Sequence, residues 1–434
     1  MRRDIIYQKW LVPITILFLC ISCVSFSVSG LAEEQVLPAS ALIALQHSAI
    51  QTGDFQINTP QVKEMKILDA KQKAALDQAI ENYEASTETL VINRSEFFYY
   101  YEALMPLERQ MYDIMYQIAK DPDNAENVGL LFTAHDPSTE EFFSSFVKAQ
   151  FAMTFDHPEL FWLYNSSETF FLFGSDNMMV NGRYNVYFYL NEPYWNYQSE
   201  MSAFNEATDR FLEDIDRKTS EYGIAKQIHD KLIEVVTYDQ DISSGGTDDL
   251  INLGHSAYGA LVADSDGRKN HAVCDGYSLA YIYLLQQCNI PAVFIGGYGG
   301  EDEDNVGGHA WNMVQLDGVW YETDVTWDDI GEADDIADPV EDALTYLVYE
   351  EAFADPVYSE VLQHKMFLLS TETISHYIPD EEERYFYSSV LNGNISLIFE
   401  SVHLREEEAG FLPADDPYLL VIATAPRAME DYPT

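Results

Sequence analysis

The sequence of 434 residues predicts an α+β protein organised around one cysteine-bearing helix and one antiparallel hairpin. A helical apolar repeat begins at Cys274, and two alternating runs flank the pair Asp317-Gly318. Further helix and strand patterns fill residues 91–215. Together these observations predict helices and antiparallel strands within one chain.

The helix is expected to begin at Cys274 and to end near Asn289 and Pro291. Asp275 falls in its first turn, where a carboxylate suits the helix dipole. Its apolar positions follow the 3.6-residue period of a helix with one buried face: Tyr277, Ala280, Tyr281, Leu284, Leu285 and Cys288.

The position of Cys274 at a helix N-terminus has a chemical consequence. Unpaired backbone N–H groups and the positive end of the dipole favour thiolate over thiol. The same N–H groups can stabilise an oxyanion when a carbonyl is attacked. Cys274 is therefore a candidate nucleophile.

The hairpin turn sets the pairing of the two strands beside it. Asp317-Gly318 is a strong two-residue turn signal, so Leu316 is expected to lie opposite Val319. Counting outward from the turn pairs each residue of the first run with one of the second.

This register places a histidine and a carboxylate on one face. Trp311 falls opposite Asp324, and His309 falls opposite Thr326. His309 and Asp324 are then diagonal neighbours, with Cβ atoms roughly 7–8 Å apart. A register slip of one residue would move Asp324 to the other face. Local pattern alone does not show whether the end of the helix packs against this face.

Three blocks in this order resemble the transglutaminase-like superfamily: residues 274–277 (Cys-Asp-Gly-Tyr), 309–312 (His-Ala-Trp-Asn) and 320–327 (Trp-Tyr-x-x-Asp-x-Thr-Trp). The similarity is greatest to the bacterial secreted branch related to cytokinesis-type transglutaminase-like proteins. It extends upstream through residues 228–230, 238–239 and 256–261.

The resemblance implies a papain-like transglutaminase core, in which the cysteine-bearing helix packs on an antiparallel sheet. It implies that Cys274 is the nucleophile, His309 the base and Asp324 the acid that orients the base. The expected activity is cysteine-dependent acyl transfer or hydrolysis on protein or peptide amides, through a thioester. Either an amine or water could resolve that thioester. The alternative is a catalytically silent cell-surface binding or scaffolding protein.

Four further residues or groups are alternatives for roles in or near this site. His271 is a rival base, but it lies too close along the chain to Cys274 to be favoured over His309. A zinc site of His271, Cys274 and His309 lacks a second close-spaced ligand pair. Tyr258 is a candidate oxyanion donor, with a packing role as its alternative. His157 is interpreted as a structural turn residue.

Composition limits the partners and cofactors. With 73 acidic against 23 basic residues, the formal charge is −50, which argues against nucleic-acid binding. The expected partner is a protein or peptide substrate. No cofactor is expected. Calcium binding by the acidic residues 301–304 is possible, but their order does not match an EF-hand, and a solvated loop is favoured.

Residues 1–32 are interpreted as an export signal, so a secreted or cell-surface location is expected. An uncleaved membrane anchor and lipid attachment at Cys23 are the alternatives. Removal of the signal leaves Cys274 and Cys288 in the mature chain. On one helix these lie about 21 Å apart, which excludes a disulfide between them.

The remaining chain is divided by pattern into four further parts. These are a linker or entry segment (33–90), an N-terminal α+β domain (91–215), the transglutaminase-like core (216–340) and a small C-terminal extension (341–434). Within them helices are expected over 70–84, 95–120, 138–151, 201–219 and 226–236, and strands near 161–162, 170–173 and 184–190.

Overall fold

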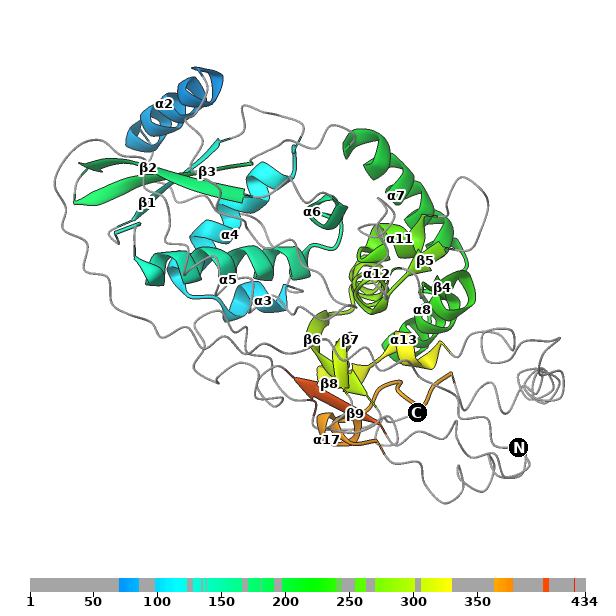
Figure 1. Ribbon diagram of the computed structural model, residues 1–434. Helices are drawn as coiled ribbons and strands as arrows, with labels where there is room; N and C mark the ends of the chain where they lie inside the picture. The colour runs from blue at the N-terminus through cyan, green and yellow to red at the C-terminus, as the bar shows by residue number, and fades with distance from the viewer. Residues whose placement is uncertain are drawn as a thin grey trace, which may run out of the picture. The chain divides into compact units, whose positions relative to one another are not determined.

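The structure of the chain is a computed structural model (Figure 1). It describes residues 70–85, 98–122, 128–133, 136–137, 139–165, 171–180, 182–190, 197–239, 242, 254–262, 270–300, 306–329, 363–377, 401–405 and 425. The expected export signal and the acidic loop 301–304 lie outside these residues. None of the helices in the described ranges is long and apolar enough to cross a membrane.

The N-terminal part contains a three-stranded antiparallel sheet in the order β1-β3-β2. The strands are β1 (Val128–Thr133), β2 (Phe171–Val180) and β3 (Arg183–Leu190), and the last two confirm the strands expected near 170 and 184. The helices of this part are α2 (Ala70–Ala85), α3 (Tyr99–Ala103), α4 (Pro106–Ala119), α5 (Glu140–Asp156) and α6 (Trp162–Asn165).

Two expectations for this part were wrong. The single helix expected over 95–120 is interrupted, because Pro106 disfavours a helical conformation at Met105, which is extended with ψ 159°. Pro106 instead starts α4 at its first position, where a missing N–H costs nothing. The strand expected at 161–162 is the start of the short helix α6.

Two helices lead from this part toward the motif-bearing segment. They are α7 (Tyr197–Glu213) and α8 (Glu221–Val235), and α8 begins at Ser220, whose side chain accepts the Gly223 N–H at 3.2 Å. A short parallel pair follows, β4 (Val236–Tyr238) with β5 (Asn270–Ala272), and α11 (Ala257–Leu261) lies between them in sequence.

A four-stranded sheet in the order β8-β7-β6-β9 contains the hairpin. Its strands are β6 (Ala292–Gly300), β7 (Val306–Leu316), β8 (Val319–Thr323) and β9 (Val402–Arg405). Asp317 and Gly318 have φ of 49° and 79°, as a type I′ turn requires. Leu316 lies opposite Val319, which confirms the predicted register.

The register holds only as far as Asn312 opposite Thr323. The expected pairs Trp311–Asp324 and His309–Thr326 do not form, because the chain turns at Asp324 into the short helix α13 (Val325–Asp328). The second run therefore ends as a helix cap rather than as a strand.

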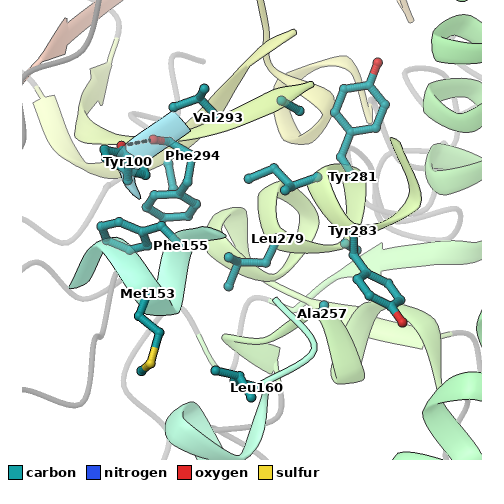
Figure 2. Packing of buried hydrophobic residues seen from close by; sticks show 14 of the residues in the cluster. Tyr100, Met153, Phe155, Leu160, Ala257, Leu279, Tyr281, Tyr283, Val293 and Phe294 are labelled. Atoms are coloured by element: carbon teal, nitrogen blue, oxygen red, sulfur yellow. Dashed lines mark hydrogen bonds between the residues drawn. The ribbon is translucent and has the colours of Figure 1, made fainter. Parts of the chain in front are cut away.

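Helix α12 (Cys274–Gln287) confirms the helix expected from Cys274. The expectation of one buried face was too narrow, because every residue from Cys274 to Leu285 is buried. A helix that is buried on all sides is a core helix. Figure 2 shows Leu279 of α12 close to Val293 and Phe294 of β6. Phe294 in turn stacks on Phe155 of α5, with ring centroids 4.5 Å apart.

Residues 363–377 and 401–405 complete the sheet from the C-terminal third of the chain. Glu322 of β8 forms an isolated bridge with Leu369, just before helix α17 (Thr371–Ser375). On the other side of the sheet, β9 pairs antiparallel with β6 and places His403 opposite Gly299. A segment assigned by its pattern to a C-terminal extension thus forms part of the same sheet as the hairpin.

Candidate active site

The centre of the candidate site is a hydrogen bond between His309 and Asp324. His309 Nε2 lies 2.6 Å from Asp324 Oδ2, and both side chains are buried. His309 comes from β7, and Asp324 directly follows β8. The bond engages Nε2 and leaves Nδ1 as the nitrogen that can accept a proton from a third group.

Asp324 is held by the backbone of the helix that it caps. Its Oδ1 accepts the N–H groups of Thr326 at 3.0 Å and Trp327 at 3.1 Å. Burial alone would raise the pKa of this carboxyl. The charge and hydrogen bond of His309, and the hydrogen bond of His403, outweigh burial and hold the pKa below its ordinary value. Asp324 is therefore ionised at neutral pH.

A second histidine, His403 of β9, also bonds to Asp324. Its Nε2 lies 2.9 Å from the same Oδ2 atom that His309 contacts. Sequence reasoning missed His403, because it stands in a stretch without a motif, 79 residues beyond Asp324. No local pattern pairs β9 with β6.

Two tryptophan rings restrict the imidazole of His309. Trp327 lies 5.1 Å from it at an interplanar angle of 29°, and Trp311 lies 6.0 Å away at 19°. Both come from the blocks that suggested the family resemblance. Large aromatic rings beside the imidazole limit its rotation and exclude water from one side of the site.

Cys274 is the first residue of α12 and is fully buried. The next turn of this helix lies beside α13, because Tyr277 donates its hydroxyl to Asp329 Oδ2 at 2.5 Å. Further along α12, Asn312 Nδ2 of β7 donates to the Ser278 carbonyl at 3.1 Å. The helix that starts at Cys274 thus contacts both β7 and the residues that follow Asp324.

The third pair of the expected triad, Cys274 with His309, stays a prediction. Side chains alternate along β7, so the face of Asn312, which meets α12, is not the face of His309. Among the described residues, no hydrogen bond joins the Cys274 thiol to the His309 imidazole. The structure therefore brings His309 and Asp324 together and places Cys274 at the helix end near α13.

A tightly packed segment supports the start of α12. The Val273 N–H donates to the Gly254 carbonyl at 3.0 Å. A Cβ atom on Gly276 would come within 2.3 Å of the same oxygen, so this position accepts only glycine without a shift. Asp275, expected to serve the helix dipole, is buried and lies 2.8 Å from His255 Nδ1. This second histidine–aspartate pair was not predicted from the sequence.

Two groups of side chains in the described part of the chain have the geometry to hold a metal ion. The ligand atoms of His309, Asp324 and His403 lie within 4.8 Å of one another, as do those of a second group, His229, Asp230 and His364. In the second group the ammonium of Lys226 already lies 2.8 Å from Asp230 and from His364.

The expected zinc alternative does not assemble in the described residues. His271 Nδ1 lies 3.5 Å from Asp239 Oδ2, on the short β4–β5 pair, whereas His309 bonds to Asp324. Because His271 pairs with Asp239 on the β4–β5 pair, it is also a weaker candidate for the base than His309. Both histidines have a carboxylate partner, but only that of His309 is fully buried.

Tyr258 and His157 make packing contacts. The Tyr258 ring packs on Phe161, with centroids 4.7 Å apart, and stacks on Phe204 at 6.3 Å. These ring contacts fit a packing role for Tyr258 rather than that of an oxyanion donor. His157 follows the end of α5 and stacks on Tyr116 at 4.0 Å, as a structural residue would.

Comparison with known proteins supports the superfamily resemblance. Residues 209–325 match the family model of the transglutaminase-like superfamily, and this segment contains Cys274, His309 and Asp324. A solved crystal structure of a TGase is 18% identical over 36% of this chain and 44% of its own chain, with a TM-score of 0.24. That score is too low to support an argument about the fold. No curated protein matches the chain. The matched segment is a transglutaminase-like domain of α+β class.

Proposed function

We propose that the transglutaminase-like domain of residues 209–325 catalyses acyl transfer from protein or peptide amides, with Cys274 as nucleophile, His309 as base and Asp324 as orienting acid. The observation that carries the proposal is the 2.6 Å bond from His309 Nε2 to a buried, ionised Asp324. Such a bond fixes the tautomer that leaves Nδ1 free to take a proton.

The first half-reaction forms a thioester. His309 Nδ1 takes the thiol proton, and the Cys274 thiolate attacks the amide carbonyl carbon. Backbone N–H groups at the start of α12 stabilise the oxyanion of the tetrahedral intermediate. The C–N bond then breaks, and the proton held by His309 passes to the leaving ammonia or amine. Asp324 stays ionised throughout and holds the imidazolium.

The second half-reaction depends on the acceptor. A lysine amine that attacks the thioester gives a cross-link, and water gives deamidation or peptide hydrolysis. Both acceptors need the same three residues, and no cofactor enters either route. With residues 1–32 as an export signal, the enzyme would act as a secreted or cell-surface protein on substrates outside the membrane.

The reaction requires the Cys274 thiol to come within hydrogen-bond reach of His309 in the reacting complex. Catalytic hydrogen bonds are often long or absent without substrate and tighten in the reacting complex. The start of α12 already adjoins α13, since Tyr277 bonds to Asp329.

A second candidate function is a binding or scaffolding protein that keeps the fold without turnover. The full burial of Cys274 and the absence of a Cys274–His309 hydrogen bond in the described residues favour it. In many families a fold is kept by members that lack the catalytic activity of their relatives. The two candidates differ in one product, the thioester.

The test is intact mass spectrometry of the secreted protein mixed with a glutamine-containing peptide. The proposal predicts an adduct equal to the peptide minus ammonia, absent in Cys274→Ala and retained in Cys288→Ala. Assays for amine incorporation and peptide hydrolysis, with Cys274→Ala as blank, then identify the acceptor. The binding alternative predicts no adduct in any variant.

A further inference from the structure

The carboxylate of Asp324 receives four hydrogen bonds. Oδ1 accepts two backbone N–H groups of α13, and Oδ2 accepts from His309 at 2.6 Å and from His403 at 2.9 Å. A carboxylate with donors on both oxygens cannot rotate without losing some of them. His403 supplies a side-chain contact that the family resemblance did not imply.

His403 is buried in the aromatic surroundings of the site. Its ring is 1% exposed and lies 4.4 Å from Trp327 and 5.1 Å from Trp311, measured between centroids. Its Nδ1 has no hydrogen-bond partner in the described part of the chain. The bond to Asp324 is therefore the polar contact of this ring there, and it requires the proton on Nε2.

The charge of His403 follows from its neighbours. Burial lowers its pKa, the adjacent His309 lowers it further, and Asp324 and Glu322 raise it. The net effect is a pKa below the ordinary value. The contact itself rests on geometry, since Nε2 lies 2.9 Å from Oδ2, beside the bond from His309.

The register of β9 positions both the His403–Asp324 contact and a second contact, between Arg405 and Glu322. Arg405, two residues further on, places Nη2 2.7 Å from Oε1 of Glu322, which is likewise two residues before Asp324. The two side chains of β9 thus match the two buried carboxylates at the end of β8. A slip of one residue in β9 would remove both contacts.

The strand beside β9 leaves room for this arrangement. Gly299 lies opposite His403, and a Cβ atom there would come within 2.9 Å of the Trp327 ring and 3.0 Å of the His309 ring. Absence of a side chain at this position lets the two histidines and the tryptophan pack together.

We propose that His403 is a positioning residue for the reaction of Cys274, His309 and Asp324. Its Nε2–H holds Oδ2 in the direction of His309 and takes up part of the carboxylate charge. The segment beyond the matched domain thus completes the site, and the inference rests on the proposed function. Because the two imidazoles share Oδ2, the donor on His403 limits how strongly Asp324 holds the His309 imidazolium, which must give up its proton in each turnover.

A matched pair of substitutions isolates the donor. Glutamine in His403→Gln can place an amide N–H near the position of Nε2, whereas His403→Met has similar size and no donor. We expect His403→Met to lower kcat about tenfold with little change in KM, because one bond to a charged group is lost. His403→Gln should stay within about threefold of wild type.

The rate of Cys274 alkylation by iodoacetamide at pH 7 gives a second readout, and rescue by glutamine separates it from a purely structural role. Loss of the donor leaves Oδ2 free to turn away from His309, so alkylation should slow about tenfold in His403→Met and stay near the wild-type rate in His403→Gln. His157→Met removes a buried histidine at the opposite end of α12 and should leave the rate unchanged.

A second measurement does not depend on folded variants. Nitrogen-15 NMR of wild-type histidines should show the His403 proton on Nε2. A proton on Nδ1 alone, or equal alkylation rates and kcat values for the Gln and Met variants, would overturn the inference. Failure of the proposed function looks different: wild type itself would then alkylate as an ordinary thiol, with no change in His309→Ala.

Discussion

The hairpin with its neighbouring helix and the strand β9 contribute to one site by different routes. His309 and Asp324 lie 15 residues apart and are joined by a two-residue turn, so local rules place them together. His403 lies 79 residues beyond Asp324 and reaches it only through the pairing of β9 with β6. Local pattern thus led to the residues proposed for catalysis, whereas the residue proposed to position them came from a segment without any motif.

The largest expected effect tests the motif-bearing region. Cys274→Ala should abolish acyl transfer, on the order of 10⁴-fold or more, because no other group on the helix can replace the thiolate. Cys288→Ala, at the far end of α12, is the matched control and should retain activity. The assay is amine incorporation or hydrolysis with purified protein. Comparable activity in the two variants would show that Cys274 is not the nucleophile.

The next effect concerns the orienting acid. Asp324→Asn presents an amide to two imidazole N–H groups that both need an acceptor, which favours the wrong tautomer of His309. We expect kcat to fall roughly 10²–10⁴-fold while the fold persists. Steady-state kinetics with a thermal unfolding control checks this. A loss of less than threefold would show that the 2.6 Å bond has no catalytic role.

A stability measurement tests the motif-free region. Arg405→Met leaves Glu322 as a buried carboxylate without its ion pair, and we expect a loss of about 3 kcal/mol in the free energy of unfolding. Lys73→Ala breaks an exposed pair with Asp77 and should cost under about 0.5 kcal/mol. Urea unfolding measures both. Equal costs would mean that β9 is only loosely attached to the sheet.

The smallest effect tests the packing under the nucleophile. Gly276→Ala puts a methyl group against the Gly254 carbonyl and should cost about 1–3 kcal/mol, with slower alkylation of Cys274. Gly307→Ala is the control, since a Cβ there meets nothing within 4 Å. We expect it to change stability by less than about 0.5 kcal/mol. If both glycines tolerate alanine equally, the close approach at the helix start is not a constraint.

The sequence predicted the parts of the fold that are specified locally. The start of α12, the Asp-Gly turn and the register from Leu316 to Asn312 follow from periodicity and turn chemistry. The prediction failed at Asp324, whose side chain accepts hydrogen bonds from nearby backbone N–H groups and caps α13. The strand therefore ends three residues earlier than its alternation suggests. Aspartate competes with sheet pairing in this way because its carboxylate bonds to nearby N–H groups.

Long-range contacts lay beyond such rules. The packing of α12 on all sides depends on α8, β6 and β7 together, and no periodicity within the helix reports it. The pairs His403–Asp324 and His255–Asp275 join segments whose own patterns are unremarkable. In both pairs the carboxylate stood in a recognised motif and its histidine did not. For Asp275, a motif carboxylate without an assigned partner was a signal that could have prompted a search for His255. Asp324 already had His309 as its partner, so no such signal pointed to His403.

Activation of the Cys274 thiol by His309 can be measured directly. The measurement is the rate of iodoacetamide modification at pH 7, located by peptide mass spectrometry, in wild type and in His309→Ala. We expect modification at Cys274 in wild type and a rate at least tenfold lower in the variant, since an unassisted thiol is only a few per cent thiolate at this pH. Equal rates in the two proteins would contradict it.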